Sequence, residues 1–284
     1  MNYVDFCGHK VSKLIVGDNP FTGHSYIPDF VPGSEMVDFC TEDRIHEAMA
    51  KMEELGINTM LPLADPFIIK TLRHYRNNGG KMNFIFQPYA PMNIDTSIWQ
   101  MMQLNPIGVY VHADRAFETD HCELILERLE LFREKMTKEF GVKVGLSTHR
   151  PEVIEKCEKE GWDFDFYFAC MYNLRRHSPG AESGFLTGVA KKAPIIRPED
   201  RAEMLDVLKK VKKPVIAFKI FAGGQLVTAV SPEEKRARIK DAYNTIFSSL
   251  KPNDIATMGV FQKYMDQLTE NVDIYNEWYN EVNK

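Results

Sequence analysis

One pattern repeats along the chain and limits its fold more than any other feature. Eight times, a short apolar segment ends in polar residues and is followed by an amphipathic stretch with helical periodicity. Strands that alternate with helices pair in parallel. Eight such units without a linker predict one domain over residues 1–284, an α/β protein of the closed (β/α)8 TIM-barrel class. The predicted strands cover residues 13–20, 57–65, 82–90, 107–114, 142–149, 164–173, 214–224 and 254–261.

Two further features of the chain bear on this fold class. An open, doubly wound sheet is the alternative, but the G-x-G-x-x-G pattern expected after its first strand is absent.

The one long irregular connection covers residues 174–196. Loops of that length in compact domains tend to bind ligands or to cover a site, so we expect such a role for this one.

Charge and composition narrow the class of partner. The 284 residues carry a formal net charge of −5, and the basic residues are scattered, so no basic face is available to bind a nucleic acid or a membrane surface. No apolar run is long enough to span a bilayer. The five cysteines show no C-x-x-C spacing, and the first residues lack a signal-peptide pattern. We therefore expect a cytoplasmic protein that binds a small molecule, and the oligomeric state is left open.

The ends of the predicted strands carry the polar side chains that matter for function. In barrels of this class the active site lies at the C-terminal ends of the strands, and side chains alternate between the barrel axis and the helices. This alternation points His112 inward on the fourth strand; on the seventh it points Lys219 inward and Phe218 toward the helices. Asp18 and Asp65 end the first and second strands. An inward cluster of such groups suits acid–base chemistry on a small polar molecule.

Each of these groups also has an alternative interpretation. Asp18 and Asp65 precede proline-containing turns, where aspartate often bonds the local backbone. His149 borders a helix start and can be a structural group there. A lysine within an apolar strand needs a partner, because burying it alone is costly, so Lys219 indicates an anion, a carboxylate or a carbonyl substrate. Asp18, His112 and His149 also have the side-chain types that bind a divalent metal, although no H-x-H or H-E-x-x-H motif supports one.

The order of several motifs resembles the aldo/keto reductase family. The opening segment is similar to the G-x-x-V-S-x-L pattern that follows the family's N-terminal hairpin, and here that pattern runs from Gly8 to Leu14. The resemblance covers most of the chain and is weakest in residues 21–105. It implies a (β/α)8 barrel preceded by a short β-hairpin, and an oxidoreductase that uses NADP. The segments that resemble the fourth to eighth strands are IGVYVHAD, VGLSTHRPEVIEKC, CMYNL, PVIAFKIFAGGQL and MGVFQKYMDQLTENV.

The resemblance assigns roles to individual residues and leaves two of the family's positions unfilled. His112 matches the histidine of the catalytic tetrad, and Asp65 matches its aspartate. The tyrosine that donates a proton and the lysine that lowers its pKa are not at their expected positions, so Tyr89 or Tyr110 is considered as a replacement donor. The positions that match the family's cofactor-binding residues are Ser147, Tyr172, Asn173 and Lys263.

Four functional hypotheses remain. The leading one is an enzyme with acid–base chemistry at a carbonyl or sugar-like polar substrate, in which His112 is the general acid or base and Lys219 stabilises an oxyanion or phosphate. Asp18 or Asp65 would orient these groups. The second hypothesis is an NADP-dependent carbonyl reductase with Tyr89 or Tyr110 as proton donor. The third is a lyase, isomerase or hydrolase that uses a divalent metal, and the fourth is an inactive barrel that senses a ligand.

Overall fold

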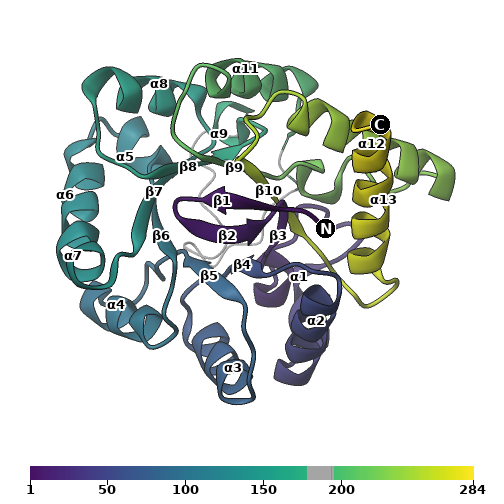
Figure 1. Ribbon diagram of the computed structural model, residues 1–284, viewed down its shortest axis with the longest axis horizontal. Helices are drawn as coiled ribbons and strands as arrows, with labels where there is room; N and C mark the ends of the chain where they lie inside the picture. Colours follow the sequence, from purple (N-terminus) through teal and green to yellow (C-terminus); the bar gives the residue numbers. More distant parts are fainter. Residues whose placement is uncertain (178–192, 194) are drawn as a thin grey trace.

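The chain forms a closed barrel of eight parallel strands surrounded by helices (Figure 1). This computed structural model describes residues 1–177, 193 and 195–284. The strand order around the barrel is β10-β3-β4-β5-β6-β7-β8-β9, so every predicted strand is present and neighbours in sequence are neighbours in space. The (β/α)8 prediction is confirmed, and the doubly wound alternative is wrong. The barrel strands are β3 (Leu14–Gly17), β4 (Thr59–Leu61), β5 (Asn83–Phe86), β6 (Gly108–His112), β7 (Lys143–Thr148), β8 (Phe166–Cys170), β9 (Val215–Phe218) and β10 (Ile255–Gly259).

The helices begin where the sequence supplies caps. Asp65 precedes α3, and its Oδ1 accepts hydrogen bonds from two backbone amides of the first helical turn. No helix in the described part of the chain combines the length and the apolar composition needed to cross a membrane. Most of the predicted binding loop, residues 178–192 and 194, lies outside the described residues. The helices are η1 (Asn19–Thr22), α1 (Gly33–Phe39), α2 (Glu42–Glu54), α3 (Pro66–Asn77), α4 (Ile94–Met102), α5 (Asp114–Glu118), α6 (Glu123–Phe132), η2 (Arg133–Thr137), α7 (Lys138–Phe140), α8 (Pro151–Glu160), α9 (Leu174–His177), α11 (Pro198–Leu208), η3 (Ala222–Gly224), α12 (Pro232–Phe247) and α13 (Gln267–Val282).

A short antiparallel hairpin covers one end of the barrel. Strands β1 (Tyr3–Phe6) and β2 (His9–Ser12) are joined by a two-residue turn whose residues both have positive φ, 54° for Cys7 and 89° for Gly8. In Figure 1 the hairpin lies in front of the ring of barrel strands. The Phe6 ring packs edge-on against Phe166, the first residue of β8, with 5.4 Å between the centroids. The expected hairpin is present; it covers the N-terminal end of the strands and leaves the C-terminal end for a site.

The inner face of β9 differs from the sequence prediction. The ring centroid of Phe218 lies 4.1 Å from that of Phe168, and Phe168 in turn contacts Tyr110, two strands away, at 4.8 Å. Phe218 therefore faces the barrel axis and not the helices. The predicted strand 214–224 was too long, because β9 already ends at Phe218. Lys219 has a φ of +57°, a left-handed conformation in which the alternation of a strand does not apply.

Candidate active site

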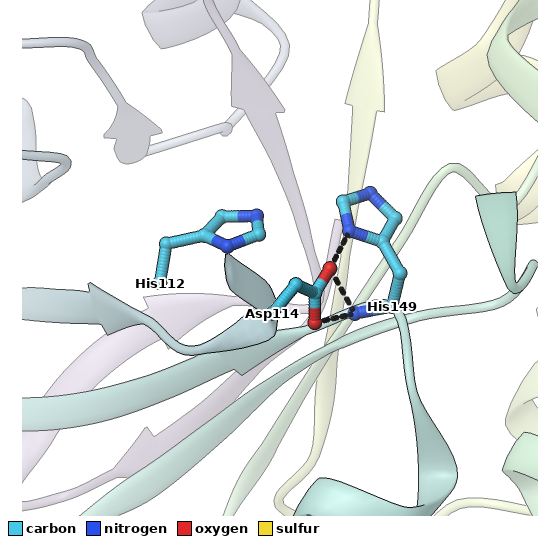
Figure 2. Close-up of side chains that lie close together, drawn as sticks. All are labelled: His112, Asp114 and His149. Atoms are coloured by element: carbon cyan, nitrogen blue, oxygen red, sulfur yellow. Dashed lines mark hydrogen bonds and ion pairs between the residues drawn. The ribbon is translucent and has the colours of Figure 1, made fainter. Parts of the chain in front are cut away.

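The centre of the site is a buried ion pair between Asp114 and His149 (Figure 2). Asp114 follows β6 and begins α5, and only 2% of it is exposed. Its Oδ2 lies 2.6 Å from His149 Nδ1, and both of its oxygens accept the backbone N–H of His149. Thr148, the last residue of β7, donates its hydroxyl to Asp114 Oδ1 at 2.5 Å. Four hydrogen bonds to one carboxylate thus fix the carboxylate and orient the imidazole.

Lys219 approaches the same imidazole from the loop after β9. Its Nζ lies 3.2 Å from His149 Nε2. Lys219 directly follows the last residue of β9 and has a left-handed backbone, with a φ of +57°. The ammonium lies 4.6 Å from the ring centroids of both Phe218 and Tyr26, so two aromatic faces contact it. Lys219 is therefore the third member of a chain that runs Asp114–His149–Lys219.

Burial and neighbouring charges set the protonation states of Asp114, His149 and Lys219. Burial, followed by the charge of Lys219, lowers the pKa of His149 to about 4, so the imidazole is neutral near pH 7. Burial alone would raise the pKa of Asp114, but the charge and hydrogen bonds of His149 hold it well below its usual value. Burial alone would lower the pKa of Lys219. Interactions with Tyr26, Cys170 and Asp114 outweigh burial and raise the pKa of the ammonium.

A single tautomer satisfies all of these contacts. The His149 Nδ1–H donates to the Asp114 carboxylate, and Nε2 accepts a hydrogen bond from the Lys219 ammonium. In this arrangement Asp114 is a carboxylate, His149 a neutral imidazole and Lys219 an ammonium. Lys219 therefore carries a positive charge at the barrel opening.

His112 completes the group at the barrel opening. It is the last residue of β6 and is exposed, whereas the four residues before it are buried. Its ring centroid lies 5.3 Å from that of His149, and the ring planes are tilted by 38°. Figure 2 shows the two rings on the same side of the strands, with Asp114 between their backbones. The structure therefore brings together His112, His149 and Lys219, three of the residues singled out from the sequence.

A metal does not fit this group as its side chains lie. One ligand atom from each of His112, Asp114 and His149 lies within 4.8 Å of the others. This set differs from the predicted one, since Asp114 stands where Asp18 was expected. Both ring nitrogens of His149 are already engaged, and the Lys219 ammonium on Nε2 would repel a divalent cation. No step of the chemistry is therefore assigned to a metal.

The two strand-end aspartates of the sequence prediction have local hydrogen bonds. Asp18 is buried, and its Oδ2 accepts the backbone N–H of Leu63 at 2.6 Å. Burial, with a smaller effect from the charge of Asp65, raises the pKa of Asp18 to about 7. Asp65 caps α3, as the alternative interpretation of its turn suggested. An orienting role for either carboxylate stays a prediction.

The tyrosines considered as replacement proton donors lie on the β5 and β6 side of the barrel. Tyr110 is buried in the barrel interior, and its hydroxyl donates to Gln87 Oε1 at 2.9 Å. Burial raises the pKa of Tyr110 well above its usual value. Tyr89 lies in the loop between β5 and α4 and is half-buried. A donor role for either tyrosine stays a prediction, and in this structure the Tyr110 hydroxyl donates to Gln87.

The residues matched to NADP-binding positions are buried or already paired in this structure, and their role in binding a nucleotide stays a prediction. Tyr172 is only 3% exposed. Lys263 is paired with Glu35, with 2.6 Å between Nζ and Oε1. Asn173 is buried and accepts a backbone N–H of α9. Ser147 lies on the inner wall of the barrel, next to His112 in the strand register. We therefore derive no step through this cofactor.

Sequence reasoning missed two members of the site. Asp114 was not among the predicted site residues, but it binds His149, which directly follows the neighbouring strand β7. Its position two residues after His112 was the only sequence feature that could have indicated a role in the site. Tyr26 lies in the irregular segment between η1 and α1, where no periodicity predicts the direction of a side chain. Its contact with Lys219 becomes visible only when two distant loops are placed side by side.

The chain is similar in fold to several solved barrel enzymes. An aldo-keto reductase from Bacillus halodurans matches with a TM-score of 0.58 and 13% identity, over 97% of this chain and 91% of that one. The glycerol dehydrogenase of Gluconobacter oxydans matches with a TM-score of 0.53 and 10% identity, over 100% and 97%. A truncated 3-deoxy-D-arabino-heptulosonate 7-phosphate synthase from Thermotoga maritima matches with a TM-score of 0.52 and 11% identity, over 99% and 90%. No family model and no curated protein matches the chain.

These likenesses extend to the fold and no further. The aldo-keto reductases and the synthase differ in their chemistry, but they match the chain to a similar degree. The resemblance noted from the motifs is thus confirmed for the barrel and its hairpin, while the specific chemistry has to be argued from the side chains.

Proposed function

We propose that the protein is an enzyme that moves a proton to and from a carbon atom next to a carbonyl group of a small, polar substrate. The observation that carries this proposal is the set of contacts around His149: its Nδ1 bonds to Asp114, its Nε2 to the Lys219 ammonium, and the ring of the exposed His112 lies 5.3 Å from its own. A carbon acid of this kind needs a base at its C–H bond and a positive charge at its carbonyl oxygen.

Lys219 supplies the positive charge. When the C–H bond breaks, its electron pair moves into the carbonyl and leaves a negative charge on oxygen. A preformed ammonium stabilises that oxyanion without having to reorganise, because His149 and two aromatic rings already hold it in place. Asp114 acts one step further back as a positioning residue, since it holds His149 in the tautomer that accepts from the lysine.

His112 is the group that carries the proton. It is exposed at the end of β6, so a substrate can reach it from solvent. In the forward step its neutral imidazole takes the proton from carbon, and in the next step the imidazolium returns that proton to carbon or to oxygen. Return to a different atom makes an isomer of the substrate. If the imidazolium first exchanges its proton with water, the hydrogen it delivers to the original carbon comes from solvent.

Exchange with solvent gives a test that does not require the natural substrate. The protein is incubated in D2O with small hydroxyaldehydes, hydroxyketones and 2-oxo acids, and deuterium at the carbon next to the carbonyl is measured by NMR. We expect incorporation into at least one compound, and we expect added NADPH to leave the rate unchanged. His112→Gln and Lys219→Met should each lower the rate by at least about a hundredfold.

Two matched variants control for general damage. His121→Gln removes an exposed histidine that is paired with Glu123 outside the site, and Lys209→Met removes an exposed lysine paired with Asp206. Both should keep the wild-type exchange rate. A His112→Gln variant that exchanges as fast as these controls, or a wild-type protein that exchanges none of the compounds, would overturn the proposal.

A further inference from the structure

Two hydroxyl groups on the inner wall of the barrel are buried without a hydrogen-bond partner among the described residues. They are Ser147 Oγ on β7 and Thr257 Oγ1 on β10. Ser147 is completely buried, and Thr257 is 6% exposed. Buried hydroxyls in native proteins nearly always have a partner, so an unpartnered one calls for an explanation. These two lie within two residues of the C-terminal ends of their strands, and Ser147 is paired with His112 in the strand register.

The strand register shows that both side chains point into the barrel. Paired residues on neighbouring parallel strands point to the same side of the sheet. Ser147 pairs with His112 on one side and with Phe168 on the other, and Phe168 packs against other rings in the barrel interior. Thr257 lies on the inner side with Gly17, because a Cβ added to Gly17 would come 3.6 Å from Thr257 Oγ1.

Strand β10, which carries Thr257, and its neighbour β3 have little side-chain bulk at their C-terminal ends. The last residues of β3 and β10 are Gly17 and Gly259, so two neighbouring strands end without a side chain. A Cβ at Gly17 or at Gly259 would meet only ordinary contacts, at 3.6 Å and 3.7 Å. Gly259 is exposed, and Gly17 and Gln87 are half-exposed, so solvent reaches these inner positions from the barrel opening.

The polar groups of this inner wall are neutral. Gln87 and Tyr110 bond to each other, and the hydroxyls of Ser147 and Thr257 are uncharged. The positive charge of Lys219 and the imidazole of His112 lie above them, at the opening. Serine and threonine hydroxyls both donate and accept hydrogen bonds. An alcohol group of a ligand can likewise accept from them and donate to them.

We infer that the substrate is a polyhydroxylated chain, an open-chain sugar or a close relative, that enters the barrel lengthwise. This inference rests on the proposed function, because the carbonyl end would lie beside His112 and Lys219. The hydroxyls further along the chain descend between the strands and bond to Ser147 and Thr257. The two glycines provide the width that the chain needs.

Binding of unreactive ligands tests this inference. The linear polyols xylitol and sorbitol carry a hydroxyl on every carbon, whereas 1,5-pentanediol and 1,6-hexanediol have the same lengths with hydroxyls only at their ends. We expect NMR titration to give dissociation constants for the polyols at least about tenfold below those for the matched diols. Ser147→Ala and Thr257→Val should each weaken polyol binding by about tenfold and leave diol binding unchanged.

The chain offers matched controls for both substitutions. Ser97 Oγ on α4 and Thr71 Oγ1 on α3 are also buried without a partner among the described residues, but they lie on helices outside the barrel. Ser97→Ala and Thr71→Val should leave polyol binding unchanged. Because each substitution removes only an unpartnered hydroxyl, all four variants should fold and melt no lower than the wild type. Gly17→Ala should also fold but block the polyols.

The outcomes separate this inference from the proposed function. If internal water satisfies the two hydroxyls, Ser147→Ala and Thr257→Val will bind polyols like the controls, and the inference is wrong. If polyols bind no better than diols while solvent exchange depends on His112, the inference fails and the proposed function stands. If polyol binding depends on Ser147 and Thr257 but no compound exchanges deuterium, the ligand class stands and the proposed chemistry fails.

Discussion

Asp114 shows how much the charge of one residue can depend on its neighbours. In a buried position an isolated carboxylate would take up a proton, but four hydrogen bonds and the neighbouring His149 keep this one ionised. Because the pKa of Asp114 is lowered on folding, the carboxylate stabilises the protein above its usual pKa of 3.8, and this contribution is lost as the pH falls further.

Replacing Asp114 by asparagine tests how much the negative charge of this side chain contributes to stability, because asparagine has nearly the same shape. Asp114→Asn keeps an acceptor for Thr148 but loses the charge, so we expect the free energy of unfolding at pH 7 to fall by about 2 kcal/mol. Urea denaturation measures this change. The control Asp206→Asn removes an exposed carboxylate that is paired with Lys209 and should stay within about 0.5 kcal/mol of the wild type. Equal stability of the two variants would contradict the role given to Asp114.

Asp18 has the opposite pH dependence. Its pKa is about 7 in the folded protein against an ordinary value of 3.8. Between these values the folded state keeps a proton that the unfolded state releases, so the stability falls as the pH rises through this window. Asp18→Asn keeps an acceptor for the backbone of Leu63 and cannot ionise.

Two denaturation curves therefore test the burial of Asp18. Relative to Asp18→Asn, the wild type should lose roughly 2–3 kcal/mol of unfolding free energy between about pH 5 and pH 8. A constant difference between the two proteins over this range would show that the Asp18 carboxyl has an ordinary pKa.

At the level of the strands, the most restrictive position is a glycine on the inner face of β7. A Cβ added to Gly145 would lie 2.2 Å from the ring of Phe166 on β8, a rigid side chain that cannot move aside in the closed interior. We expect Gly145→Ala to cost about 2–3 kcal/mol of unfolding free energy. Gly17→Ala, where the nearest atom would be 3.6 Å away, should cost less than about 1 kcal/mol. A reversed order of the two melting temperatures would contradict the inner-wall packing described for these strands.

The strands were predictable from the sequence, but the last residues of β9 were not. Apolar segments between helical patterns identify parallel strands because such strands are buried on both faces. Where a strand stops depends on backbone angles, and nothing in FKIFAGG shows that Lys219 adopts a left-handed conformation. The inward direction of Lys219 was therefore predicted for the wrong reason. The pairing of Asp114 with His149 needs two strand ends in three dimensions, and a single sequence does not supply this.

For the whole molecule, the N-terminal hairpin contributes stability without taking part in the site. Phe6 is 2% exposed and packs on Phe166 at the closed end of the barrel, away from His112 and Lys219. Phe6→Ala should lower the unfolding free energy by about 3–5 kcal/mol. Phe30→Ala removes a ring that is 59% exposed and should change stability little. Both variants should keep the wild-type rate of solvent exchange at a temperature where they are folded, and a slower rate for Phe6→Ala would mean that the hairpin shapes the site.

The barrel and its hairpin were also predictable at this scale, whereas the chemistry was not. The order of eight strand–helix units fixes the closed sheet, and the solved neighbours confirm that fold. The same fold carries reductases and a synthase among those neighbours, so the arrangement of strands does not select a reaction. Only the contacts of the side chains at the barrel opening bear on it.

The protonation of His149 is the quantity on which the central claim depends most directly. A pH titration of the histidine ring nitrogens by 15N NMR measures it without any substrate. In the wild type, His149 should remain a neutral imidazole with its proton on Nδ1 until the pH falls to about 4. In Lys219→Met the loss of the neighbouring ammonium should raise this pKa. A wild-type His149 that titrates near 6.5, with no response to the loss of Lys219, would contradict the Asp114–His149–Lys219 chain.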